Sequence, residues 1–181
     1  MLQKPGSITL PIPIKIVEYK HFIDECCAFI NDIDSFCNDY SKSAKFKLVI
    51  MELLTNAVKH SKTVSYLEII KTDDQLIIKK IDGGNKFAFK DIFSNEIIQF
   101  PMPHFTHGKK ITALLGNNYK LPLVVKSGNK VEFLEPFEVD YSEMNIPENF
   151  GLLIIKQCSD YFYYYFDENK KQNVFEVIFN L

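Results

Sequence analysis

The pattern of apolar and polar residues predicts a short strand and two helices in the first third of the chain. Residues 8–10 are strand-like and are followed by two prolines. Apolar residues then recur at helical spacing over 14–33 and again over 43–60, so each of these segments has an apolar face. Ser43 stands at the start of the second segment, where we expect it to cap the helix.

Alternation of apolar and polar residues predicts a β-hairpin and a C-terminal pair of strands. Four segments are expected to be strands on this pattern: residues 65–71, 75–81, 161–166 and 173–179. A short helix is expected over 151–159. Residues 90–147 hold many prolines and short apolar pieces, which indicate short strands and loops. We interpret 90–147 as an extended lid or insertion within a single domain of residues 1–181.

Six consecutive aromatic residues, Tyr161 to Phe166, place rings on both faces of one predicted strand. We expect one face to pack against the helices. Two explanations stay open for the other face. The rings are ordinary core packing, or the face is covered by the insertion or by another subunit.

Composition and charge narrow the classes of protein to which the chain can belong. It has 181 residues, of which 46% are hydrophobic and 24% charged, as is typical of one globular domain. All 21 basic residues are lysine, so an arginine finger supplied by this chain is excluded. A net charge of −2 argues against a nucleic-acid binder. No apolar run reaches the roughly 20 residues of a membrane span, and the N-terminus lacks a signal-peptide core, so we expect a cytoplasmic protein.

Cysteine and histidine spacing gives no metal site. The cysteines include no C-x-x-C pair and are expected to be buried, reduced thiols: Cys26, Cys27, Cys37 and Cys158. His104 and His107 have the spacing of metal ligands, but no third ligand stands near them. We therefore expect these two histidines to lie exposed in a loop.

Polar side chains that could take part in catalysis or binding lie on one face of the helix predicted over 43–60. They are a carboxylate, a carboxamide, an amine and an imidazole: Glu52, Asn56, Lys59 and His60. The far side of the helix is apolar: Phe46, Ile50, Leu53, Leu54, Ala57 and Val58. Taken alone, an ordinary amphipathic helix with a solvated face also explains this pattern.

Two glycine-containing segments follow that helix in the sequence. Asp82 ends a predicted strand and precedes Gly83 and Gly84, which would let the backbone approach a ligand closely. Gly151 opens an apolar helix, whose free N–H groups and dipole favour an anion such as phosphate. Taken singly, a plain turn and a helix start without a ligand explain these segments.

In this order the three segments resemble the boxes of the GHKL (histidine kinase-like) ATPase superfamily, and most closely those of the anti-sigma factor serine kinases. Residues 52–61, with the sequence ELLTNAVKHS, look like the N box of that family. Residues 82–84 look like its first glycine box, and 151–152 look like the end of its second. The resemblance covers about 7–90 and 148–181.

The resemblance implies a role for each residue of the N box. Asn56 would ligate Mg²⁺ through its amide oxygen, and triphosphate oxygens and water would complete the octahedron. Glu52 would be the catalytic base that orients a seryl hydroxyl or a water toward the γ-phosphate of ATP. Lys59 or His60 would lie near the phosphates.

The glycine boxes would hold the two ends of the nucleotide. Asp82 would accept a hydrogen bond from the adenine amino group, and Gly84 would leave space for the base. Gly151 and Leu152 would offer backbone N–H groups to the phosphates.

The chain departs from the family pattern at several places. Asn149 stands where the second glycine box has a glycine, and residues 173–175 stand where the family has a threonine near adenine. The two glycine boxes are separated by the long insertion. Four of its lysines could replace a basic lid residue as point charges: Lys109, Lys110, Lys126 and Lys130.

The implied fold is α+β: a two-layer α/β sandwich of the Bergerat, histidine-kinase-like type, with a mixed sheet and helices on one face. The implied function is an ATP- and Mg²⁺-dependent regulatory domain that phosphorylates or sequesters a partner protein. That partner would be a sigma factor or an anti-anti-sigma-like protein, with no nucleic acid or membrane, and the chain could form a homodimer. The alternative is a non-catalytic GHKL-type interaction module with a degenerate nucleotide site. A plain ATPase would use the same site.

Overall fold

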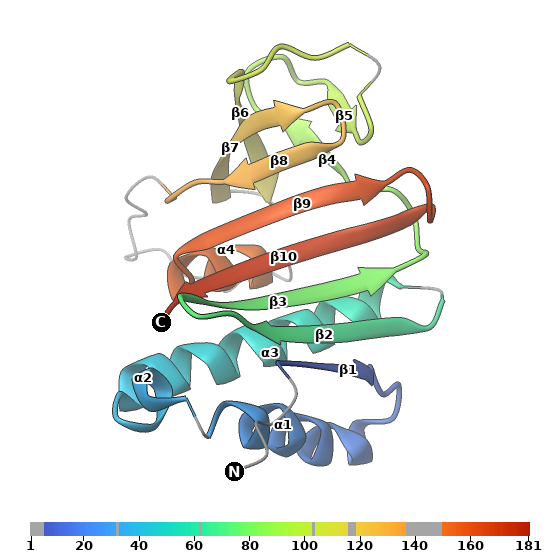
Figure 1. Cartoon of the computed structure of the whole chain (residues 1–181). Coiled ribbons are helices and arrows are strands. Elements are labelled where there is room, and N and C mark those ends of the chain that lie inside the picture. The colour runs from blue at the N-terminus through green and yellow to red at the C-terminus, as the bar shows by residue number, and fades with distance from the viewer. Residues whose placement is uncertain (1–5, 32, 62, 103, 116–118, 137–149) are drawn as a thin grey trace.

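The computed structural model describes residues 6–181 apart from 32, 62, 103, 116–118 and 137–149. In this part of the chain ten strands form one sheet, in the order β1-β2-β3-β10-β9-β8-β7-β6-β4-β5 (Figure 1). Every neighbouring pair in that order is antiparallel.

The strands are β1 (Ser7–Pro11), β2 (Ser65–Lys71), β3 (Gln75–Asp82), β4 (Ala88–Asp91), β5 (Ile97–Gln99), β6 (Lys110–Leu115), β7 (Tyr119–Ser127), β8 (Lys130–Phe133), β9 (Tyr161–Asp167) and β10 (Gln172–Asn180). The helices are α1 (Ile16–Ile30), α2 (Asp34–Cys37), α3 (Tyr40–His60) and α4 (Gly151–Cys158). The strands and helices expected at both ends of the chain are thus confirmed, as are the short strands between residues 90 and 134.

The predicted fold class is wrong. We expected a two-layer α/β sandwich with a mixed sheet and helices on one face, whereas most of the structure is a single ten-stranded antiparallel sheet with four helices in the described part of the chain. The reason is that the strands of the insertion join the main sheet instead of forming a separate lid. β8 hydrogen-bonds to β9, so β8, β7, β6, β4 and β5 extend the sheet by antiparallel pairing, and Figure 1 shows no helix beside them.

Helix α3 begins earlier than the sequence pattern predicts. Its N-cap is Asp39, whose carboxylate accepts a hydrogen bond from the backbone N–H of Lys42 at 3.0 Å. Ser43, the expected cap, instead donates its hydroxyl hydrogen to the carbonyl oxygen of Phe36 at 2.6 Å. The prediction for Ser43 is therefore wrong, because the aspartate four residues earlier caps the helix by accepting from one of the free N–H groups of the first turn.

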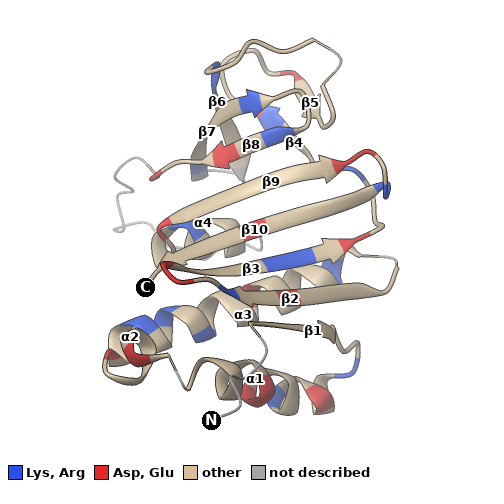
Figure 2. Cartoon of the chain, in the orientation of Figure 1, with Lys and Arg blue, Asp and Glu red and all other residues tan. Residues whose placement is uncertain are grey.

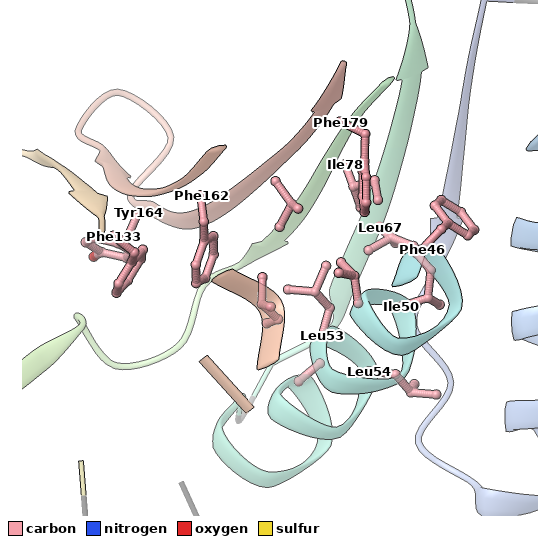
Figure 3. Packing of buried hydrophobic residues seen from close by; sticks show 14 of the residues in the cluster. Phe46, Ile50, Leu53, Leu54, Leu67, Ile78, Phe133, Phe162, Tyr164 and Phe179 are labelled. Atoms are coloured by element: carbon pink, nitrogen blue, oxygen red, sulfur yellow. The ribbon is translucent and has the colours of Figure 1, made fainter. Parts of the chain in front are cut away.

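The apolar face of α3 packs against the sheet and holds the helix in place. Figure 3 shows Ile50, Leu53 and Leu67 pointing into the space between α3 and the strands. Phe46 contacts Phe179 of β10 with ring centroids 6.3 Å apart. The expected burial is confirmed for the apolar residues of this face except Val58, which is 38% exposed.

The register of β3 and β10 decides which side chains face the helices. On β3 the inward-facing residues are buried: Leu76, Ile78, Lys80 and Asp82. Asn173 of β10 pairs with Asp82, and Phe175 pairs with Lys80, so they share this inward face. Because period-2 alternation admits a lysine and an aspartate into a row of buried positions, polar groups are placed deep inside the fold at this end of the sheet.

The outward face of the sheet carries the other half of the aromatic run. Tyr161 and Tyr163 stack with centroids 6.4 Å apart, and the ammonium of Lys130 lies 4.3 Å from the ring centroid of Tyr163. In Figure 2 this side shows charged residues on β3 and β8 and few on β9. In the described ranges the insertion lies beside this face as added strands and does not cover it. That another subunit covers this outward face stays a prediction.

The cysteines are confirmed as free thiols, but only Cys26 is fully buried, and Cys37 is exposed. His104 and His107 are exposed, as expected. No group of three or more metal-ligating side chains occurs among the described residues. Within the same residues, no helix combines the length and apolar character that a membrane crossing requires.

Candidate functional site

A cavity of about 370 Å³ lies where α3, α4, β3 and β10 meet the start of the insertion. Its volume falls within the range of small-molecule sites. Its walls come from segments far apart in the sequence: Asn56 on α3, Asp82 on β3, Leu152 on α4 and Asn173 on β10 all line it. The fold therefore brings the three predicted boxes to one place.

The N box contributes to the cavity through one edge of α3. Asn56 and His60 line the cavity, whereas Lys59 is exposed on the same helix and does not line it. The side-chain amide of Asn56 makes no hydrogen bond to another described residue and lies next to Gly151. Its amide oxygen is thus free to accept a ligand.

Glu52 lies one turn before Asn56 and faces the start of α4. A Cβ added at Gly151 would lie 2.6 Å from Oε2 of Glu52 and 3.5 Å from Oδ1 of Asn56, so both side chains rest against the glycine backbone. Burial raises the pKa of the Glu52 carboxyl, and the nearby Lys59 ammonium partly offsets this rise. Glu52 is therefore a half-buried carboxylate beside the positively polarised end of a helix.

The first turn of α4 presents unpaired backbone donors. The N–H groups of Gly151 and Leu152 have no intrahelical acceptor, because they are the first two of the helix, and no described residue accepts from them. Asn149, where the family pattern has a glycine, lies outside the described residues. Of Gly151 and Leu152, only Leu152 lines the cavity, together with Asn56.

Asp82 is the centre of a buried hydrogen-bonded network at the other end of the cavity. Oδ1 accepts hydrogen bonds from the backbone N–H of Gly84 at 2.8 Å and from Nδ2 of Asn173 at 3.1 Å. Oδ2 accepts from Nζ of Lys80 at 2.5 Å, and both of these side chains are about 5% exposed or less. The carboxylate charge is thus paired with a buried ammonium.

Asn173 locks the turn that follows β3. Its Nδ2 donates to the carbonyl oxygens of Gly84 and Asn85, and its Oδ1 accepts from the hydroxyl of Tyr164 at 2.9 Å. Every hydrogen-bonding atom of the Asn173 side chain is therefore used inside the protein. Asn173 stands where the family pattern has a threonine, and its role here is to fix the position of Asp82 and Gly84.

Residue 84 must be a glycine because the Asp82 carboxylate lies very close to its backbone. An added Cβ would lie 2.8 Å from Oδ1 of Asp82, which real contacts of this kind do not allow. The carbonyl oxygen of His60 lies 3.6 Å from that added Cβ, which is an ordinary contact distance, so the clash is with the Asp82 carboxylate alone. This explains the glycine after Asp82 without reference to a ligand.

Aromatic rings form the remaining wall. Phe87, Phe89 and Phe175 line the cavity, and the Phe87 centroid is 5.7 Å from that of Phe89 and 5.5 Å from that of Phe175. Lys80 lies over the Phe175 ring, with its Nζ 5.1 Å from the centroid. A planar aromatic ligand would meet flat apolar surface beside a polar edge.

The sequence interpretation missed several lining residues and proposed others that lie elsewhere. Lys80 and Lys86 line the cavity, whereas none of Lys109, Lys110, Lys126 and Lys130 does. Lys126 pairs with Glu132 at 2.6 Å, and Lys130 pairs with Glu176 at 3.4 Å on the outward face. Lys80 could have been recognised in the sequence, because it stands at an inward position of an alternating strand.

The residues present fit a magnesium ion only if most of its ligands are phosphate oxygens and water. Asn56 would be a single protein oxygen ligand, because no cluster of metal-ligating side chains lies near it in the described residues. Mg²⁺ commonly keeps several waters and binds through one or two protein oxygens together with substrate phosphates. A metal at Asn56 would therefore depend on a phosphate ligand to be held.

No family model matches the chain, and no curated protein matches it.

Proposed function

We propose that this cavity binds ATP together with Mg²⁺, and that the chain is a regulatory domain that phosphorylates or sequesters a partner protein. The observation that carries the proposal is the convergence of Asn56, Asp82 and Leu152 on one cavity. Each of these residues comes from a different one of the three boxes. The proposal depends on this local geometry and not on the two-layer fold that we expected.

The inner end of the cavity suits a purine base. Phe87 and Phe175, which pack edge to face against each other, would offer apolar surface to the base. Oδ2 of Asp82 keeps a lone pair for a donor on the edge of the base. The remaining atoms of the Asp82 network are held rigidly by Asn173. A base would thus meet a preorganised edge.

The outer end suits the phosphates. The free N–H groups of Gly151 and Leu152 would bind phosphate oxygens, and Lys86 and His60 would add donors or charge. Mg²⁺ would be held between Asn56 and the phosphates, where it would neutralise developing charge on the γ-phosphoryl group.

Phosphoryl transfer would use Glu52 as the base. The carboxylate accepts the proton of a seryl hydroxyl of the partner, or of a water, as the oxygen bonds to the γ-phosphorus. The bond from that phosphorus to the β–γ bridging oxygen breaks, and ADP leaves. By resemblance, the partner would be a sigma factor or an anti-anti-sigma-like protein.

A second candidate is a non-catalytic interaction module. The Lys80 ammonium already occupies one lone pair of the carboxylate that the resemblance assigns to adenine. If that ion pair excluded the base, the domain would bind its partner without nucleotide. Titration with nucleotide separates the two candidates.

Asn56→Ala is expected to weaken the binding of ATP in the presence of Mg²⁺ by roughly tenfold, because one metal ligand is lost. Binding of ATP in the presence of a chelator should be unchanged, since the amide is proposed to act through the metal. Isothermal titration calorimetry of the wild type and of Asn56→Ala, each with Mg²⁺ and with a chelator, measures this difference.

Asn169→Ala is the matched control, because Asn169 is exposed in the turn between β9 and β10, away from the cavity. It should bind ATP like the wild type under both conditions. Equal affinities for Asn56→Ala and Asn169→Ala would remove Asn56 from the metal site. Absence of any binding by the wild type would contradict the proposed function.

A further inference from the structure

Lys80 is an unusual residue for the position it holds. It is 3% exposed, it lines the cavity, and its side chain lies between Asp82 and the ring of Phe175. Its neighbour Lys79 faces the other side of the sheet, where it pairs with Glu68 and Glu176. A buried lysine is expensive to hold unless its charge is paired, and the Asp82 carboxylate provides that pairing.

The donors of Lys80 are only partly used. An ammonium group has three N–H donors, and Asp82 accepts one of them. No other hydrogen bond from Nζ to a described residue exists. Two donors of Lys80 thus remain for a ligand that enters the cavity.

Asp82 is left with one free acceptor position. Oδ1 is occupied by two N–H groups, whereas Oδ2 accepts only from Lys80. A carboxylate oxygen can accept two hydrogen bonds. The edge that faces the base therefore offers one acceptor and, directly beside it, one cationic donor.

This pair of groups complements both kinds of purine edge. With position 6 of the base beside this pair, the exocyclic amine of a 6-aminopurine donates to Asp82 and needs nothing from Lys80. In a 6-oxopurine the group at the same position is the O6 carbonyl, which accepts from Lys80. A lone carboxylate would instead repel O6, so an aspartate without the lysine would favour adenine.

We infer that Lys80 makes the cavity accept guanine as well as adenine nucleotides, by donating a hydrogen bond to the base beside Asp82. The inference rests on the proposed function, because it assumes that a purine nucleotide occupies this cavity. It makes Lys80 a residue that determines base specificity.

The test compares the dissociation constants of ATP and GTP, both with Mg²⁺, by calorimetric titration. The wild type is expected to bind the two nucleotides within about tenfold of each other. Lys80→Met should raise the ratio of the GTP to the ATP dissociation constant by roughly tenfold, the loss of one hydrogen bond, because O6 then faces the carboxylate without a donor. Lys79→Met removes the adjacent lysine from the opposite face and should leave the ratio unchanged.

If the role of Lys80 were only structural, Lys80→Met would weaken the binding of ATP and of GTP equally. An unchanged ratio of the two dissociation constants in Lys80→Met therefore overturns the inference. Binding of ATP without GTP by the wild type overturns it as well, and leaves the proposed function standing. Binding of neither nucleotide contradicts the proposed function itself.

A measurement on the wild type alone covers the case in which Lys80→Met does not fold. The triphosphate of 2-aminopurine riboside has neither O6 nor the N1–H of guanine. It should bind roughly tenfold or more weakly than GTP. Equal affinity would show that neither Lys80 nor Asp82 contacts that edge of the base, and would also overturn the inference.

Discussion

Asp82→Ala is expected to lower the free energy of unfolding by about 3–5 kcal/mol and to abolish detectable nucleotide binding. The substitution leaves the Lys80 ammonium buried without a counter-charge. It also removes the acceptor of the Gly84 N–H and one acceptor of the Asn173 amide. Urea denaturation measures the stability, and calorimetric titration with ATP and Mg²⁺ measures the binding.

Asp73→Ala provides the matched control, because Asp73 is exposed in the turn between β2 and β3. Its free energy of unfolding should stay within about 0.5 kcal/mol of the wild type. Adding Lys80→Met to Asp82→Ala should recover part of the lost stability, since the unpaired charge is then removed. A stability of Asp82→Ala equal to that of Asp73→Ala would show that the buried pair is unimportant to the fold.

Glu52→Gln is expected to lower the rate of phosphate release from ATP by about 10²–10⁴-fold while the dissociation constant of ATP changes little. The amide keeps the size of the side chain against Gly151 but cannot accept the proton of the attacking hydroxyl or water. A phosphate-release assay with ATP and Mg²⁺ measures the rate, with water as the acceptor. Glu18→Gln, an exposed position in the first turn of α1, should retain the wild-type rate.

The pH dependence of that rate gives an independent check on Glu52. The carboxylate must be deprotonated to act as a base, and burial raises its pKa above the ordinary value of 4.5. The wild-type rate should therefore fall as the pH is lowered through this raised pKa, at a higher pH than for an exposed glutamate. The residual rate of Glu52→Gln should lack this step. A step that persists in Glu52→Gln would assign the titration to another group.

The candidate site was predictable from the sequence where one element carries several site residues. Asn56 and His60 share a face of α3 because they are one turn apart, and helical spacing alone indicates this. Lys59 shares the face of Glu52, two turns earlier, and helical spacing could not show that it stays exposed and does not line the cavity. Only the fold could show that Gly151 rests against Glu52 and Asn56.

The fold class could not be predicted, because it depends on which strand of the main sheet pairs with the insertion, and the sequence pattern does not indicate that strand. The strands of the insertion were expected, but their pairing partner was not. The pairing of Val131 with Tyr164 and of Phe133 with Phe162 joins the insertion to β9. Buried aromatic contacts such as Phe133 on Phe162, with centroids 4.2 Å apart, favour that register over a separate lid. Such contacts between distant segments leave no trace in local periodicity.

The charged part of the cavity comes from polar residues in buried positions of β3 and β10. Lys80 and Asp82 were both visible as interruptions of an inward-facing apolar row. The resemblance of residues 82–84 to a glycine box points to Asp82 and gives no role to Lys80. The role of Asn173 follows from its hydrogen bonds to Asp82, Gly84 and Tyr164, and these depend on contacts between strands that the sequence does not show.

The central claim, that this cavity is a nucleotide site, is tested most directly by NMR chemical shifts of the backbone amides during titration with ATP and Mg²⁺. We predict that the largest changes fall on residues 82–86 and 151–153 and on the side-chain amide of Asn56. The outward face of β9 and β10 should change little. Saturating changes confined to that face, or no changes at any nucleotide concentration, would contradict the account.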